Sequence, residues 1–188
     1  MKKITTLFLA LMMGAMMFSF KADDAGELIT RTGHIWFSSK TAMETIDGHN
    51  KQVASILKTK TGELVFSVIM KSFEFQKALM QEHFNEKYLE TDKFPKATFK
   101  GKITNLAAIN FSKDGSYKAD VEGDLTIHGV TKKIIEKATF TVKGADVNAK
   151  CDIKVVLSEY NITVPRVVVD KIAKAVDVNM DMDYKPKK

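Results

Sequence analysis

Cysteine is nearly absent from this chain of 188 residues, and proline and glycine are also scarce. The single cysteine, Cys151, excludes an intramolecular disulfide and any zinc site built from several thiolates. Three prolines and ten glycines are too few for a collagen-like chain. With 45% hydrophobic and 28% charged residues, the composition is that of one ordinary globular domain whose core is held by packing alone.

The first 22 residues have the pattern of a secretory signal peptide. Lys2 and Lys3 precede an apolar run from Ile4 to Phe20, which is slightly too short and too weakly flanked for a stop-transfer helix. The best cleavage position follows Ala22, but it lacks a clean small-residue motif, so an uncleaved membrane anchor is the alternative. We expect a signal peptide over 1–22, a barrel domain over 23–188, and a periplasmic or secreted protein.

The formal net charge of +6 owes much to this leader. Removing Lys2, Lys3 and Lys21 leaves 26 basic and 23 acidic residues. So small an excess does not favour an electrostatic grip on nucleic acid.

Apolar and polar residues alternate along most of the remaining chain, as in strands with one dry and one wet face. The predicted strands are His34–Ser39, Val53–Lys60, Glu63–Lys71, Ala97–Ile103, Tyr117–Ile127, Ile134–Lys143, Cys151–Leu157 and Val176–Tyr184. A helical stripe predicts one helix over Gln76–Tyr88, and Pro165 makes Val164–Ala175 a loop or a bulged edge. We therefore predict an all-β fold with one short helix: a closed antiparallel barrel of about eight strands, because closure removes exposed edges.

The sequence does not bring together groups that carry catalysis or bind metals. The chain has four histidines: His34, His49, His83 and His128. None of them has a metal-binding spacing, and the acidic residues recur at every second strand position, as a solvated face requires. No nucleophile motif is present, and the inward-facing Cys151 is expected to behave as a small hydrophobe. We expect no catalytic residue, no metal site and no cofactor.

Aromatic and methionine side chains are concentrated around the predicted helix. They are Phe66, Met70, Phe73, Phe75, Met80, Phe84, Phe94 and Phe99. Such a cluster is more often core than pocket, but these side chains also adapt to a long apolar ligand, and a helix at a barrel mouth can form a lid. Small residues at six inward positions favour a cavity: Ala97, Gly101, Ala119, Gly123, Ala138 and Cys151. At about eight strands, a barrel interior either fills with side chains or holds one small ligand.

Two strings of residues resemble a known family. Gly123–Lys132 reads GDLTIHGVTK, and Gln81–Phe99 reads QEHFNEKYLETDKFPKATF. Together they resemble the YceI-like family, secreted lipocalin-like proteins known as polyisoprenoid-binding proteins. The resemblance implies an antiparallel barrel that holds an isoprenoid or other amphiphilic chain in its lumen, in the periplasm and without catalysis. The chain departs from the family pattern at Ser158–Ile162, where an R-x-D/E-F-G-I-like string is common.

Twelve residues are the candidates for contact with a ligand. The residues expected to form the apolar lumen and lid are Phe66, Met70, Phe73, Phe75, Met80, Phe84, Phe99, Leu125, Ile127 and Phe140. His83 and His128 are the expected contacts of a ligand head group, although turn chemistry also explains His128, because Gly129 lets the chain reverse there.

The favoured function is binding, transport or sequestration of a long-chain isoprenoid or another amphiphilic lipid, because each buried methylene contributes about 0.8 kcal/mol. The first alternative is a filled barrel that serves as a stress or interaction module without a ligand. The second, least favoured, is an isoprenoid-processing enzyme, which would need an inward metal site or a phosphate cradle. The expected partner is a lipid, with no nucleic acid and no stable membrane insertion after cleavage; a dimer is compatible with the sequence.

Overall fold

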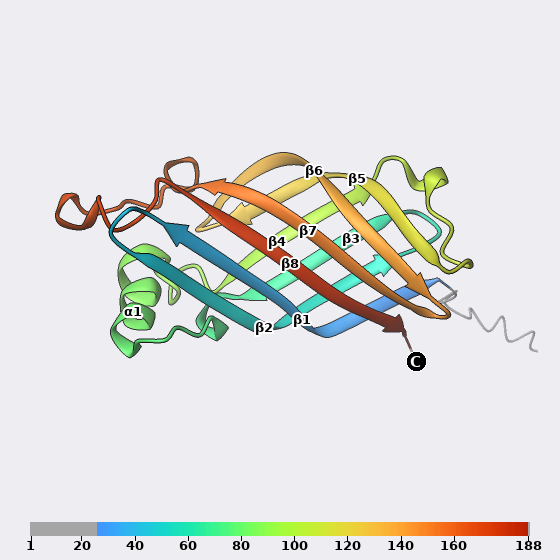
Figure 1. The fold of residues 1–188 in the computed structure, drawn as a ribbon, viewed down its shortest axis with the longest axis horizontal. Helices are drawn as coiled ribbons and strands as arrows, with labels where there is room; N and C mark the ends of the chain where they lie inside the picture. The colour runs from blue at the N-terminus through green and yellow to red at the C-terminus, as the bar shows by residue number, and fades with distance from the viewer. Residues whose placement is uncertain (1–25, 188) are drawn as a thin grey trace, which may run out of the picture.

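A computed structural model describes residues 26–187, so the predicted signal peptide lies outside the described residues. Eight strands form one sheet in which each strand is antiparallel to the next and β8 pairs with β1, closing a barrel (Figure 1). The strands are β1 (Glu27–Lys40), β2 (Thr45–Lys58), β3 (Glu63–Ile69), β4 (Lys96–Ile103), β5 (Gly115–Ile127), β6 (Val130–Lys143), β7 (Asp146–Val156) and β8 (Ala175–Pro186). The predicted all-β antiparallel barrel is confirmed.

The alternating sequence pattern explains which face of each strand is buried. In β5, Ala119, Val121 and Gly123 are buried while the residues between them are more exposed. The hairpin from β5 to β6 turns through His128 and Gly129, whose φ angles of 50° and 74° are both positive. Two consecutive positive φ angles give a tight turn whose twist matches that of the flanking strands.

The first two strands extend beyond the predicted ranges. In β2, Asn50 is fully buried, and its amide donates a hydrogen bond to the carbonyl of Ile69 at 2.9 Å. Asn50 can be buried because its amide is hydrogen-bonded. A polar residue at a buried position breaks the apolar–polar alternation, so the pattern does not reveal this part of the strand. In β1, the register shifts between Thr30 and Ile35 interrupt the two-residue period.

Most helical segments lie at one end of the barrel, whereas η3 (Leu106–Ala108), between β4 and β5, lies at the opposite end (Figure 1). The predicted helix over Gln76–Tyr88 is an α-helix, α1 (Ala78–His83), followed by one π-helical turn, η2 (Phe84–Tyr88), and both lie at the left in Figure 1. Short 3₁₀ turns occur at η1 (Met70–Ser72), η3 (Leu106–Ala108), η4 (Leu157–Tyr160) and η5 (Arg166–Val168). The last of these belongs to the long connection between β7 and β8, so Val164–Ala175 is a loop and not a bulged edge.

The barrel interior is packed with large side chains. Those buried most completely are Tyr184, Phe140, Leu57, Met182, Val53 and Val142. The Tyr184 hydroxyl is hydrogen-bonded to Ser55 at 2.6 Å, and burial raises the pKa of the tyrosine. A large part of the lumen is thus filled by the chain itself.

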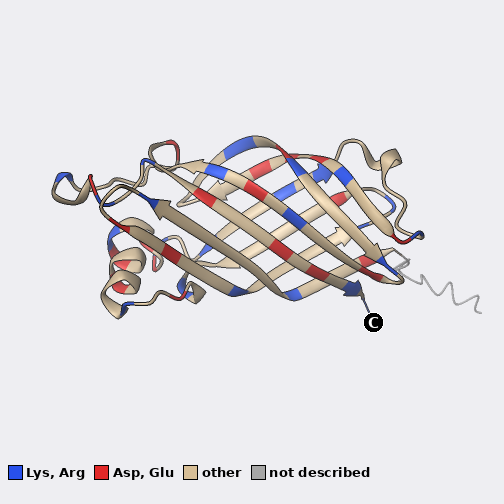
Figure 2. Cartoon of the chain, viewed as in Figure 1, with Lys and Arg blue, Asp and Glu red and all other residues tan. Residues whose placement is uncertain are grey.

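The outer wall carries the charges. Figure 2 shows basic and acidic segments beside one another on neighbouring strands. Ion pairs join Lys137 to Asp120 at 2.9 Å and Lys133 to Glu122 at 2.8 Å. The acidic residues at every second position face outward, as the alternation predicts, and several of them pair with lysines.

Candidate functional site

An apolar cavity of about 90 Å³ lies in the lumen. Seven of the eight strands contribute side chains to it, and only β2 does not. Its apolar lining consists of Ile35, Leu64, Phe66, Val68, Ala97, Phe99, Val121, Leu125, Ile134, Ala138, Phe140, Ala149, Cys151, Ile153, Met180 and Met182. These side chains come together because each occupies an inward position of its strand.

The small inward residues leave less space than their size suggests. Gly101 and Gly123 face each other across β4 and β5, and a methyl group on either would come within about 2.6 Å of Cζ of Phe99. The Phe99 ring therefore fills the space above both glycines. On β1, the side chain of Met182 lies against Gly33 in the same way.

The ten predicted lumen and lid residues fall into three groups. Phe66, Phe99, Leu125 and Phe140 line the cavity. The rings of Phe66 and Phe99 meet edge to face, with centroids 6.0 Å apart.

The second group packs at the helical end, outside the cavity lining. The ring of Phe84 contacts those of Phe37, Phe73 and Phe75, with centroids 5.7, 5.4 and 5.0 Å away. Phe84 is buried, so this aromatic cluster anchors η2 to the barrel. Whether the cluster also contacts a ligand stays a prediction.

The remaining predicted residues do not line the cavity either. Met70 is buried in the core, and Ile127 packs against it at the end of β5. Met80 is partly buried on α1.

The two histidines predicted to contact a head group occupy different environments. His83 is exposed on α1. His128 has 8% of its side chain exposed; its Nδ1 lies 3.1 Å from the Tyr160 carbonyl and its Nε2 lies 2.9 Å from Glu90. Its ring also meets that of Phe94 edge to face. His128 thus joins three separate segments at the helical end, which supports the structural explanation of the GDLTIHGVTK string.

Two charged residues that we did not predict contribute to the cavity lining, Glu136 and Lys150, and Lys150 is paired with Asp181 at 3.0 Å. Glu136 lies on β6 between the inward residues Ile134 and Ala138. Burial raises its pKa. The strand alternation places it inside, so the signal was present in the sequence.

Cys151 occupies the same part of the lumen. Its thiol donates a hydrogen bond to the Lys137 carbonyl at 3.3 Å. Burial, with a smaller contribution from the charges of Glu136 and Asp152, raises its pKa to about 12. The thiol therefore stays protonated at neutral pH, as expected for a buried small hydrophobe.

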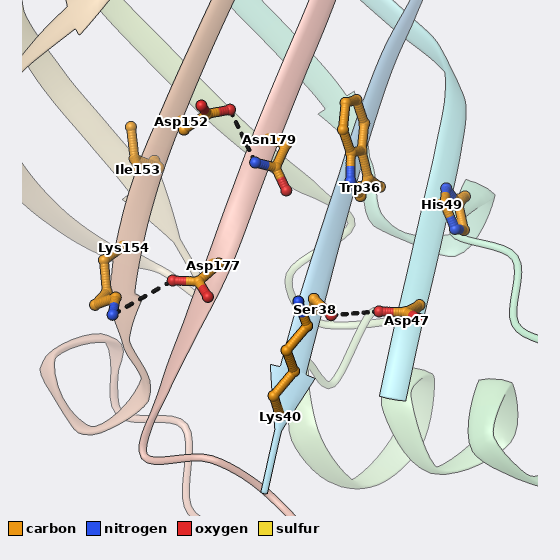
Figure 3. A pocket seen from close by; sticks show the side chains of 10 residues that line it. All are labelled: Trp36, Ser38, Lys40, Asp47, His49, Asp152, Ile153, Lys154, Asp177 and Asn179. Atoms are coloured by element: carbon orange, nitrogen blue, oxygen red, sulfur yellow. Dashed lines mark hydrogen bonds and ion pairs between the residues drawn. The ribbon is translucent and has the colours of Figure 1, made fainter. Parts of the chain in front are cut away.

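A second hollow of about 630 Å³ lies on the outer wall, across β7, β8, β1 and β2 (Figure 3). Trp36 lies within it, and polar pairs border it, including Asp152 with Asn179 at 2.8 Å and Lys154 with Asp177 at 3.4 Å. The sequence does not distinguish this surface from the rest of the outer wall, because strands with polar outer faces all have the same alternation. Its side chains are largely paired with one another, as on an ordinary solvated wall.

Within residues 26–187, no group of three or more His, Cys, Asp or Glu residues is arranged to hold a metal ion. Over the same residues, no helix is both long and apolar enough to span a membrane.

An eight-stranded, up-and-down antiparallel barrel around an apolar cavity defines the chain as a lipocalin-like barrel. The YceI-like domain model matches residues 26–184, and the chain belongs to this family.

Curated relatives match over a shorter stretch. A UPF0312 protein of Pseudomonas fluorescens is 42% identical over 66 residues, which cover 35% of this chain and 32% of the relative. A UPF0312 protein of Pseudomonas syringae pv. tomato is 41% identical over 66 residues, covering 35% and 31%. The matches span about a third of the length of these relatives.

Solved structures share the fold at low sequence identity. A polyisoprenoid binding domain from Saccharophagus degradans, implicated in plant cell wall breakdown, has a TM-score of 0.75 at 14% identity, over 86% of this chain and 99% of that one. BcnA of Burkholderia cenocepacia has a TM-score of 0.68 at 18% identity, over 80% and 95%. At these identities the likeness establishes the fold.

Proposed function

We propose that this chain binds a long-chain isoprenoid or another amphiphilic lipid in its lumen, and that it does so in the periplasm without catalysis. The observation that carries the proposal is the apolar cavity enclosed by seven strands. A barrel of the same fold described as a polyisoprenoid binding domain supports it. Binding in such a cavity needs few specific polar contacts, because burial of each methylene contributes about 0.8 kcal/mol.

A long chain enters this lumen only if side chains move. The cavity holds about 90 Å³, whereas small-molecule sites usually enclose roughly 300–1,000 Å³. Two of the side chains that fill the lumen are suited to move: Met182 has a flexible, unbranched side chain, and Phe99 lies over two glycines. We therefore expect the ligand to take the place of these side chains.

The same small cavity favours a second candidate function. If Phe99 and Met182 stay in place, the lumen is a packed core and the protein is an interaction module that binds no lipid. The two functions differ in whether lipid copurifies with the protein.

Native mass spectrometry of protein purified from its own periplasm, followed by organic extraction, tests the proposal. We expect an adduct with the mass of a lipid and the same lipid in the extract. Protein without an adduct, which also fails to take up added prenyl lipids, would favour the packed barrel.

Cell fractionation tests the proposed location. We expect a shortened chain in the periplasmic fraction. A full-length chain that stays with membranes after a carbonate wash would contradict removal of the signal peptide. Recovery of the extracted lipid unchanged after prolonged incubation with the protein would support binding without catalysis.

A further inference from the structure

The wall of the barrel is interrupted between β6 and β7. These strands pair only over Ala138–Lys143 and Asp146–Cys151. Beyond that point, 130–137 pairs only with β5 and 152–156 pairs only with β8. The Cys151 thiol donates to the Lys137 carbonyl where the ladder stops, so a side chain replaces the missing backbone donor.

Glu136 is the first inward residue of β6 beyond this point. Its neighbours in sequence face outward: Ile135 is 71% exposed, and Lys137 pairs with Asp120. Glu136 itself is partly buried and lines the cavity beside Ile134 and Ala138. The carboxylate therefore lies where the apolar lumen meets the interruption in the wall.

The described residues provide no partner for this carboxylate. Glu122 and Asp120, on the outer wall of the neighbouring strand, are both paired with lysines, whereas Glu136 has no hydrogen bond and no ion pair within residues 26–187. Its oxygens are not fully buried, so the cost of leaving them unpaired is partial, and burial still raises the pKa of this carboxyl group. The Cys151 thiol nearby remains neutral and does not compensate its charge.

We propose that Glu136 accepts a hydrogen bond from the head group of the luminal ligand, and that the interruption between β6 and β7 is where this head group lies. This inference rests on the proposed function. It restricts the ligand to an amphiphile whose polar end carries a hydrogen-bond donor and no negative charge, such as a long-chain alcohol or amine. Phosphorylated and carboxylated lipids are disfavoured, because their anionic ends would lie beside the carboxylate, and the lysine in the cavity lining, Lys150, is already paired with Asp181.

Three probes with the same tail test the restriction: farnesol, farnesylamine and farnesyl phosphate. Titrations with wild-type protein at neutral pH should give dissociation constants for the alcohol and the amine at least about tenfold lower than for the phosphate. Equal binding of all three would overturn the inference and leave the proposed function intact. If none of the three binds, the proposed function fails and the inference fails with it.

The variant Glu136→Gln then assigns the discrimination to this side chain. It should bind farnesyl phosphate more tightly than the wild type does. The ratio of the dissociation constant of farnesyl phosphate to that of farnesol or farnesylamine should therefore shrink at least about fivefold. Glu122→Gln is the matched control, because it neutralises a carboxylate on the outer wall and should leave the preference unchanged. An unchanged preference in Glu136→Gln would overturn the inference. The comparison among the three probes with wild-type protein tests the same restriction if the variant does not fold.

A decrease in affinity for the amine, but not for the alcohol, in Glu136→Gln would show that the carboxylate contacts the amine probe mainly through its charge. Decreases for both would show that it also accepts a hydrogen bond from the hydroxyl. Both outcomes support a head group that lies at Glu136.

Discussion

Replacement of Phe99 by alanine tests whether the lumen holds a ligand in place of the chain's own side chains. Phe99 is buried, and its ring fills the space above Gly101 and Gly123. Removing the ring should lower the free energy of unfolding by about 3–5 kcal/mol, the usual cost of a buried Phe→Ala change. The same change enlarges the cavity that a lipid would occupy.

The lost ring lowers the free energy of unfolding, whereas the larger cavity should increase the stabilisation that a bound lipid provides. A ligand at 100 times its dissociation constant stabilises the folded state by about 2.7 kcal/mol. Because the enlarged lumen no longer needs to displace a ring, we expect farnesol to stabilise Phe99→Ala more than it stabilises the wild type. Urea denaturation with and without farnesol measures both quantities.

Phe73→Ala is the matched control. Phe73 is also buried, but it belongs to the aromatic cluster at the helical end and not to the cavity lining. It should lose a similar amount of stability and show no additional gain from the ligand. If Phe99→Ala gains no more from farnesol than Phe73→Ala does, the ligand does not occupy the space of the Phe99 ring.

Three further substitutions probe the lumen, the helical end and the luminal carboxylate. Leu125→Trp should weaken lipid binding in titrations at a stability cost of about 1–3 kcal/mol, whereas Ile135→Trp, at a position 71% exposed on the outer wall, should change neither quantity. Phe84→Asp should lower the unfolding free energy by about 3 kcal/mol or more, since Phe84 is buried among three other aromatic rings; a variant as stable in urea as the wild type would place its side chain in solvent. Burial raises the pKa of Glu136, so its contribution to stability is fully present below the unfolded pKa and is lost as the pH rises through the folded pKa. The melting temperature of Glu136→Gln relative to wild type should therefore increase from about pH 4 to about pH 7, and a constant difference would contradict the raised pKa.

The strands and their inward faces were predictable because they depend on a local pattern. The alternation around Ala119 and Val121 identifies both the strand and its dry face, and β5 has that face buried. The same pattern failed at the start of β2, where the burial of Asn50 depends on a carbonyl of another strand. A tertiary hydrogen bond of this kind leaves no local signal.

The volume of the lumen was not predictable from residue sizes. Six small inward residues favoured a cavity, but Phe99 covers two of them from within its own strand pair. Which space a ring fills depends on its rotamer and on its neighbours across the sheet. The interruption between β6 and β7 depends in the same way on pairing between strands, so the position of Glu136 beside it could not be read from the alternation that places it inside.

The pairing of β1 with β8 has a consequence for the order of assembly. Every other pair in the described barrel joins strands that are neighbours in sequence, whereas this pair joins the first strand to the last. Seven pairings between consecutive strands can form as the chain emerges, but β1 keeps one open edge until β8 has been made. Contacts between such distant segments have the largest entropic cost of loop closure. The pairing of β1 with β8 is therefore expected to limit the folding rate. Until then the unpaired edge of β1 is open to pairing with other chains, and a factor that shields this edge would raise the yield of folded protein more than one that shields any internal strand.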